Sequence, residues 1–271
     1  MNAPSSTASQ PSSVAWERVW RSEPTAAKDA TLLARERASK RWALIVERLE
    51  ATFGSIRGLS AVELGSGRGD LSTLLAERGA EVTLVDSCEQ ALDQARTRFD
   101  RLGLTARFEQ ADFLDPAFAR RRRFDISLSS GVIEHFIRDE RTRSIRAHRA
   151  VLKDHGMAII SVPHAHCPPY RVWKRYLELR GWWPYGAEIP YAKRELVRRA
   201  REAGFASTET QCTGLLQSIG SHWVQRLFGV RPAWTDGSCA LDSLMGSTLI
   251  LFGWTKRAAG KGEPCRAEIR E

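Results

Sequence analysis

Three glycines at alternate positions and one aspartate are the residues of this chain whose types and spacing best fit ligand binding. Gly65, Gly67 and Gly69 stand where a predicted strand ends, and Asp86 ends the next predicted strand. Glycine has no Cβ, so its backbone can approach a ligand closely. A carboxylate about twenty residues after such a turn can accept hydrogen bonds from ribose hydroxyls. The pattern therefore predicts a cofactor with a nucleoside, bound across the tips of neighbouring parallel strands.

The residues around the glycines argue against a dinucleotide. The dinucleotide fingerprint is G-x-G-x-x-G, and its third glycine is replaced here by Asp70. A pyrophosphate at the following helix N-terminus would be repelled by that carboxylate. A dinucleotide also gives no role to Glu63, just before the glycines.

The run from Glu63 to Gly69 resembles motif I of the class I S-adenosylmethionine-dependent methyltransferases, a hydrophobic strand followed by E/D-x-G-x-G-x-G. Residues 58–165 contain further elements similar to this family in the same order. They are the ribose-binding acid at Asp86, the third strand and adenine-binding acid at residues 108–113, the fourth strand at 124–130, the "VIEH" run at 131–136 and the fifth strand at 156–163. The resemblance implies S-adenosylmethionine as cofactor, bound by Glu63, Gly65, Ser66, Gly67, Gly69, Asp86, Ser87, Asp112, Phe113 and Ser129.

Alternating strands and helices predict an α/β fold with a parallel sheet and right-handed crossovers. Strands are expected at 61–65, 81–86, 105–111, 124–130, 157–162, 205–213 and 246–255, and helices at 69–78, 87–102, 139–153 and 192–203. The family resemblance implies a Rossmann-like seven-stranded sheet, mostly parallel with an antiparallel seventh strand. The methyltransferase domain is expected at 58–256, after a disordered tail at 1–13 and an N-terminal helical segment at 14–57. A polar tail is expected at 257–271.

The N-terminal segment has two features of interest. Trp16 and Trp20 are expected to anchor a short first element, and Pro24 precedes one long helix that ends at Gly54. Apolar residues spaced by three and four, from Ala34 to Phe53, give this helix one apolar face. Such a helix either covers the cofactor or packs on the edge of the sheet.

Two segments at 164–191 and 214–245 lie outside the common core and are rich in aromatic residues. The first follows the fifth strand, at the edge where open α/β sheets bind ligands. We expect a helical aromatic cap that encloses the acceptor and excludes water. Its candidate substrate-binding residues are Tyr170, Trp173, Trp183, Tyr185 and Tyr191.

Three histidines near the strand ends are candidate general bases. His135 is the first choice because it follows the fourth strand directly and has Glu134 beside it; His164 and His166 are the others. A positioned histidine contributes on the order of 10²–10⁴ in rate. In-line methyl transfer also proceeds by alignment alone, so no base is strictly required.

No metal site is expected from the sequence. In ubiquinone-pathway O-methyltransferases the stretch that resembles residues 131–136 has a further Glu three residues before the Glu-His pair, and Gly131 stands there in this chain. His164, His166 and Cys167 are ligand types for zinc, but no second cluster completes a tetrahedral set. The run Cys167-Pro168-Pro169-Tyr170 is similar to the (N/D/S)-P-P-Y motif of amine methyltransferases, but it follows the fifth strand instead of the fourth. We interpret it as a rigid entry to the cap.

Composition narrows the remaining alternatives. The 271 residues are 42% hydrophobic, enough for a full core, with no apolar run long enough to span a membrane and no signal-peptide pattern. Five scattered cysteines without a CxxC pair fit a reducing cytoplasm. The net charge of +9 is densest at Arg120–Arg123, without interleaved aromatic residues for base stacking, so we do not expect nucleic acid as a partner.

The sequence therefore favours a cytoplasmic methyltransferase that acts on a small aromatic or hydrophobic metabolite. Two alternatives stay open: an RNA or protein methyltransferase that uses the basic surface, and a non-catalytic module that binds S-adenosylmethionine. A fourth hypothesis, an NAD-dependent oxidoreductase, is the one that the residues around the glycines favour least. The oligomeric state is not encoded in any recognisable pattern.

Overall fold

A computed structural model describes residues 13–22, 24–120, 123–225, 229 and 237–256. The expected tails at 1–13 and 257–271 lie outside the described residues, apart from Ser13. Arg121 and Arg122 of the arginine cluster also lie outside them, as does part of the second cap segment.

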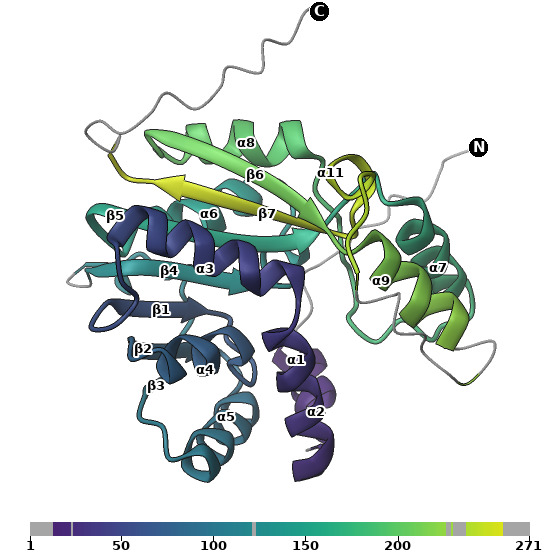
Figure 1. The fold of residues 1–271 in the computed structure, drawn as a ribbon, viewed down its shortest axis with the longest axis horizontal. Coiled ribbons are helices and arrows are strands. Elements are labelled where there is room, and N and C mark those ends of the chain that lie inside the picture. The colour runs from purple at the N-terminus through teal and green to yellow at the C-terminus, as the bar shows by residue number, and fades with distance from the viewer. Residues whose placement is uncertain (1–12, 23, 121–122, 226–228, 230–236, 257–271) are drawn as a thin grey trace, which may run out of the picture.

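In the described part of the chain, seven strands form one sheet in the order β3-β2-β1-β4-β5-β7-β6 (Figure 1). The strands are β1 (Ser60–Leu64), β2 (Glu81–Asp86), β3 (Arg107–Gln110), β4 (Phe124–Ser130), β5 (Leu152–Pro163), β6 (Ser207–Thr213) and β7 (Thr248–Trp254). The first five strands pair in parallel, while β7 runs antiparallel to both β5 and β6. The Rossmann-like sheet with an antiparallel seventh strand is confirmed.

Helices cover both faces of this sheet, as a buried parallel sheet requires. They are α3 (Lys40–Phe53), α4 (Asp70–Glu77), α5 (Glu89–Leu102), α6 (Glu140–Ala150) and α8 (Lys193–Glu202), with a 3₁₀ turn, η1 (Ile133–His135), after β4. Two further helices, α1 (Ser13–Trp20) and α2 (Ala26–Arg37), pack on these helices and not on the sheet. Alternation along β5 shows the two layers. Met157 and Ile159 pack in the core with α3, α4 and α5, and Ala158 and Ile160 pack in the core with α6 and α8. Figure 1 shows α3 crossing the near face of the sheet.

The expected long N-terminal helix is two helices, so that prediction is wrong in one respect. Helix α2 ends at Arg37 with Ala38 as its C-cap, and Ser39 adopts an extended conformation with ψ 149°. The Ser39 hydroxyl accepts a hydrogen bond from the Trp42 amide at 3.0 Å, which caps α3. The apolar spacing continues across the break and hides it, whereas a serine before the second apolar run is a recognisable start signal.

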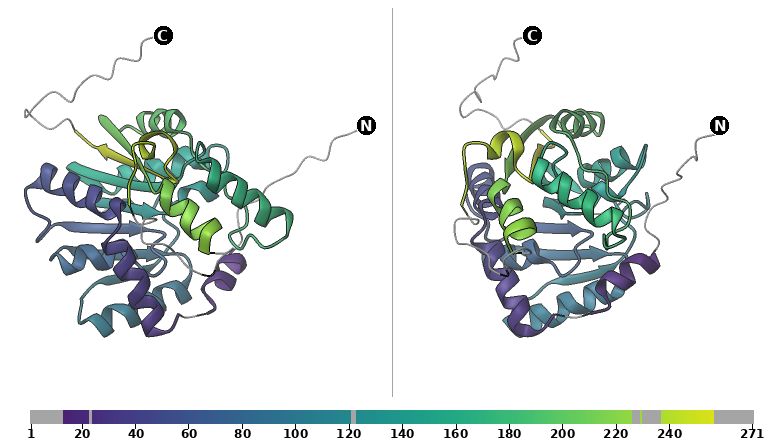
Figure 2. Two further views of the ribbon diagram at one scale, coloured as in Figure 1. Left: turned by 45° about the vertical axis from the view of Figure 1, so that its right-hand side comes forward. Right: turned by 90° about the vertical axis from the view of Figure 1, so that its right-hand side faces the viewer.

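Both cap segments contribute to one helical body beside the sheet (Figure 2). It contains α7 (Pro168–Leu179), α9 (Leu215–Ile219), a π-helical turn η2 (Gly220–Val224) and α11 (Asp242–Met245). Trp173 of the first segment meets Trp223 of the second edge-on, with ring centroids 5.5 Å apart. The Trp223 indole also donates to the Pro169 carbonyl at 3.3 Å. The helical aromatic cap is therefore confirmed as part of the fold.

None of the described helices combines the length and apolar character needed to cross a membrane.

Candidate functional site

A cavity of about 360 Å³ lies at the carboxyl ends of β1, β2 and β4. Eight of the residues expected to bind the cofactor line it: Glu63, Gly65, Ser66, Gly67, Asp86, Ser87, Asp112 and Phe113. Residues that are far apart in the sequence meet there because the carboxyl ends of parallel strands share one edge of the sheet.

The glycine turn is held to β2 by backbone bonds. The amides of Gly65 and Ser66 both donate to the Val85 carbonyl, at 2.8 and 2.9 Å. The Gly67 amide donates to Asp86 Oδ2 at 2.8 Å. Gly67 has φ 52°, and a Cβ there would lie 2.7 Å from the Trp20 ring. Glycine is needed at this position both for its conformation and for the close approach of the neighbouring ring.

Glu63 forms the floor of the cavity and is only 3% exposed. Its Oε2 accepts hydrogen bonds from the Ser72 amide at 3.1 Å and from the Ser72 hydroxyl at 2.6 Å. Burial, reinforced by the nearby Asp70, raises the pKa of Glu63 to about 7 despite these bonds. Near neutral pH, a positively charged ligand group would stabilise its ionised form.

The far end of the cavity is apolar. Phe113 packs edge-on against Phe136 at 5.8 Å, and Ala111 and Leu114 line the wall beside them. Asp112 is exposed, and its Oδ1 accepts the Leu114 amide at 2.8 Å. A flat aromatic base fits among such side chains, and the Asp112 carboxylate belongs to the same lining.

Two expected cofactor residues do not line this cavity. Gly69 instead forms the left-handed N-cap of α4, with φ 69°. Ser129 is fully buried, while Ser130, one residue later, lines the cavity. Alternation along β4 explains the difference, because successive side chains of a strand point to opposite faces.

Sequence reasoning missed Arg41, which lines the cavity from α3. Its guanidinium donates to both carboxylate oxygens of Glu36, at 2.8 and 2.6 Å, and to the Ser130 hydroxyl. An arginine held in this way presents a fixed positive group to a ligand carboxylate. In the sequence, its place four residues before the apolar Ile45 puts it on the buried side of the predicted helix, and this was the one signal that it faces the interior.

A second cavity of about 460 Å³ adjoins the first and shares six lining residues with it. The shared residues are Trp16, Trp20, Arg68, Ser130, Gly131 and His135. Helix α1 thus covers both cavities. Trp16 meets the His135 ring edge-on at 4.9 Å, and the Gln94 side chain donates to the Trp20 carbonyl at 2.6 Å.

His135 is the candidate base that lies at the boundary of the two cavities. Its Nδ1 is 2.9 Å from the Ala187 carbonyl. Since a carbonyl only accepts, Nδ1 carries the proton and Nε2 keeps its lone pair. Burial lowers the pKa of His135, which keeps the ring neutral near pH 7. Neither His164 nor His166 lines these cavities: His164 is buried against the Gly246 carbonyl, and His166 is exposed.

Of the five aromatic residues expected to bind the substrate, one lines the second cavity and the other four do not. Tyr185 lines the second cavity. Tyr191 is fully buried in the core, with its hydroxyl 3.3 Å from the Ile133 carbonyl. Trp173 and Trp183 pack within the cap, and Tyr170 donates from the cap to the Glu188 carboxylate.

A family model described as a methyltransferase domain matches residues 61–156. A ubiquinone biosynthesis O-methyltransferase of Bordetella avium is 27% identical over 118 residues, which are 44% of this chain and 48% of that protein. The curated relatives are matched over about a third to a half of their length, from 31% to 54%.

Solved structures match over nearly the whole chain. The magnesium protoporphyrin IX methyltransferase of Synechocystis, solved with SAH, has a TM-score of 0.54 and 17% identity, covering 89% of this chain and 92% of that one. The 1,6-didemethyltoxoflavin N1-methyltransferase of Burkholderia thailandensis has a TM-score of 0.57 and 18% identity, covering 94% and 93%. At these identities the likeness shows the fold.

Proposed function

Since the chain belongs to the class I S-adenosylmethionine-dependent methyltransferases, we propose that it transfers a methyl group to a small aromatic or hydrophobic metabolite. The observation that carries the proposal is the pair of adjoining cavities. One fits the cofactor, the other leaves room for an acceptor, and the same six residues line both.

The first cavity fits the charge of the cofactor. Four acidic side chains line it, those of Glu63, Asp70, Asp86 and Asp112, beside the two arginines Arg41 and Arg68. This excess of carboxyl groups favours a sulfonium and an ammonium group and disfavours a pyrophosphate. A Cβ at Gly65 would lie 2.7 Å from Val132, so this position of the turn has no room for a side chain. When bound, S-adenosylmethionine supplies an electrophilic methyl group.

Each wall of this cavity has a proposed role. Asp86 accepts the ribose hydroxyls while its other contacts hold the Gly67 amide in place. Asp112 and Phe113 bind the adenine, and Arg41 pairs with the carboxylate of the methionine part. Glu63 balances the positive charge at the floor of the cavity.

The second cavity is proposed to hold the acceptor. Trp16, Trp20 and Tyr185 give it aromatic walls, and Glu134 and Glu188 give it a polar end. Aromatic faces with a few converging polar groups are typical of small-molecule sites. The relatives' names fit this class, since they describe methylation in ubiquinone biosynthesis and of 1,6-didemethyltoxoflavin.

His135 is proposed to accept a proton from the acceptor. Its Nε2 has a free lone pair, and its ring lies where the two cavities meet. Alignment of acceptor and methyl group by the enclosing tryptophans supplies the larger part of the effect in an in-line displacement.

Transfer of label from methyl-labelled S-adenosylmethionine into a fractionated cell extract tests the proposal. Label in the small-molecule fraction with the wild-type protein, and none with Asp86→Ala, is the expected result. Label in RNA or protein would contradict the acceptor class. If the protein binds S-adenosylmethionine but no fraction is labelled, the proposed enzymatic role is wrong.

A further inference from the structure

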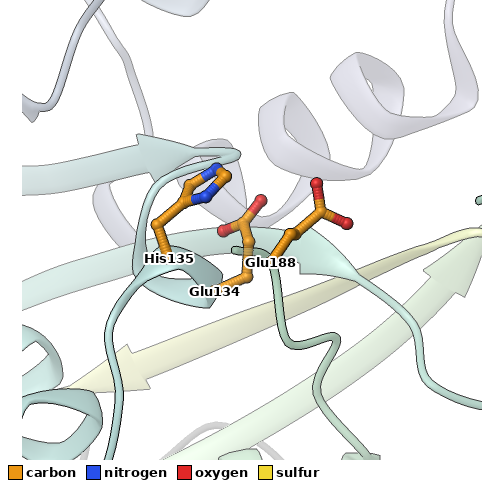
Figure 3. Close-up of side chains that lie close together, drawn as sticks. All are labelled: Glu134, His135 and Glu188. Carbon is orange, nitrogen blue, oxygen red and sulfur yellow. The ribbon is translucent and has the colours of Figure 1, made fainter. Parts of the chain in front are cut away.

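Glu134, His135 and Glu188 come together at the polar end of the second cavity (Figure 3). One ligand atom from each lies within 4.8 Å of the other two. In the part of the chain that the structure describes, no other three histidine, cysteine or acidic side chains are grouped in this way. Glu134 and His135 belong to η1 after β4, whereas Glu188 comes from the loop that follows α7.

Two carboxyl groups held close together, Glu134 buried and Glu188 half-buried, are stabilised by a proton or a cation between them. Glu134 is 1% exposed, and its Oε2 has no hydrogen-bond partner. Among the described residues, neither Glu134 nor Glu188 forms an ion pair with a basic side chain. Lys28 and Arg68 line the same cavity, but among the described residues no ion pair joins either of them to these two carboxyl groups. Arg141 pairs with Glu195, and Lys174 pairs with Glu178. The buried, unpartnered oxygen of Glu134 therefore points to a missing positive partner.

The surrounding contacts hold the three side chains in place. The Ile189 amide donates to the Glu134 carbonyl at 2.9 Å, which fixes the Glu188 loop against η1. His135 Nδ1 donates to the Ala187 carbonyl at 2.9 Å, so Nε2 is the atom that is free to coordinate. The Tyr170 hydroxyl donates to Glu188 Oε1 and leaves Oε2 available. Hydrogen bonds of this kind, one step behind the ligand atoms, orient the ligands in metal sites.

We propose that Glu134, His135 and Glu188 form a binding site for a divalent transition-metal ion of the manganese-to-zinc series. One imidazole nitrogen and two carboxylate oxygens suit these ions, whereas calcium and magnesium prefer oxygen alone. A cation about 2.0–2.2 Å from each of three tetrahedrally arranged ligands holds the ligand atoms about 3.3–3.6 Å apart. Since the three atoms lie within 4.8 Å of one another, the ligand side chains would have to move together by up to about 1.5 Å when the cation binds. Three protein ligands leave a coordination position open toward the cavity.

Cation binding stands independently of methyl transfer, but its consequence for the reaction rests on the proposed function. A hydroxyl group that reaches the open position would release its proton to solvent water more easily, since a bound divalent cation lowers the pKa of its oxygen ligands. The cation would occupy the lone pair of His135 Nε2, so activation of the acceptor would pass from the histidine to the cation.

Titration of the purified full-length chain with Mn²⁺ tests the site without any methyl donor. The protein is first treated with EDTA and dialysed, and free Mn²⁺ is followed by its six-line EPR signal. We expect one saturable site per chain, with the Kd raised at least tenfold in Glu134→Gln and in Glu188→Gln. Glu202→Gln is the matched control, because Glu202 pairs with Arg198 on the exposed face of α8. Its Kd should equal that of the wild type.

Thermal melts of each variant separate lost ligation from lost folding. A Glu188→Gln protein that melts like the wild type and binds Mn²⁺ at least tenfold more weakly supports the site, and Tyr170→Phe should weaken binding to a smaller degree. Absence of saturable binding to the wild type would overturn the proposal, as would an unchanged Kd in folded Glu188→Gln. If the wild type binds no Mn²⁺ and Glu134→Gln raises the melting temperature, the two carboxyl groups share a proton and the proposal is wrong. None of these results depends on methyl transfer, so the two proposals can fail separately.

Discussion

The protonation of Glu63 predicts how cofactor affinity depends on pH. The side chain is 3% exposed at the floor of the first cavity, and burial raises its pKa to about 7. A cationic ligand binds to the ionised form, so protonation competes with binding. At pH 8 the carboxyl is about nine-tenths ionised, and at pH 6 about nine-tenths protonated, for a pKa of about 7. The Kd for S-adenosylmethionine should therefore rise about tenfold from pH 8 to pH 6, equivalent to about 1.4 kcal/mol.

Calorimetric titration at pH 6, 7 and 8 measures this dependence. Glu63→Gln is the matched variant because the amide keeps the shape of the side chain and an oxygen that can accept from Ser72. The amino group of the ligand titrates identically in both experiments, so the difference between the two proteins isolates Glu63. The variant should bind more weakly at pH 8 and lose the tenfold dependence. Equal pH dependence in both proteins would refute the role assigned to Glu63.

The same raised pKa predicts an effect on the stability of the ligand-free protein. Because the folded-state pKa lies above the unfolded value of 4.5, the stabilising contribution is fully present below pH 4.5 and is lost as the pH rises through about 7. The loss is about 3 kcal/mol when the group is fully ionised. Glu63→Gln should therefore be more stable than the wild type at pH 8 in urea unfolding, with little difference at pH 4.5. A variant less stable than the wild type at pH 8 would contradict the burial argument.

Three further substitutions have defined outcomes. Asp86→Ala should weaken S-adenosylmethionine binding about a hundredfold in calorimetry, since charged hydrogen bonds contribute about 1.5–3 kcal/mol each. The control variant Asp100→Ala, changed at an exposed position of α5, should bind S-adenosylmethionine as the wild type does. An equal loss of affinity in both variants would refute the role assigned to Asp86. Arg41→Ala should weaken binding of S-adenosylmethionine about tenfold but leave the affinity for 5′-methylthioadenosine, which lacks the carboxylate, unchanged. Equal effects on the two ligands would refute the pairing of Arg41 with the ligand carboxylate. Arg98→Met should lower the free energy of unfolding, measured in urea, by about 3 kcal/mol. The reason is that Arg98 is 1% exposed and forms ion pairs with both Asp29 and Asp70. A loss below about 1 kcal/mol would show that these buried ion pairs contribute little to stability.

The first cavity, which we propose as the cofactor site, was predictable because its residues follow strand ends that the sequence marks clearly. The glycine turn after β1 and Asp86 at the end of β2 are local signals, and parallel strands bring them to one edge. The assignment of Ser129 differs from the cavity lining by one position. Successive side chains of a strand point to opposite faces, so an error of one residue selects the wrong face. Ser130 lines the cavity, whereas Ser129 is buried.

The second cavity was harder to predict from the sequence because its walls come from segments that are far apart in the chain. Glu188 lies in an irregular loop more than fifty residues after His135, with no periodic pattern that predicts its place. The expectation that no metal is bound rested on Gly131 and on the local run, where a third ligand is absent. Tyr191 was a reasonable aromatic candidate, but its side chain packs in the core below the cap. Side-chain direction in loops is set by tertiary packing, which composition does not encode.

A crystal structure of the protein with S-adenosylhomocysteine tests the central claim most directly. The account predicts the ligand in the cavity at the ends of β1, β2 and β4, with its ribose hydroxyls on Asp86 and its carboxylate on Arg41. The adjoining cavity beside His135 should stay open for the acceptor. A ligand bound elsewhere, or a ribose that does not contact Asp86, would contradict the account.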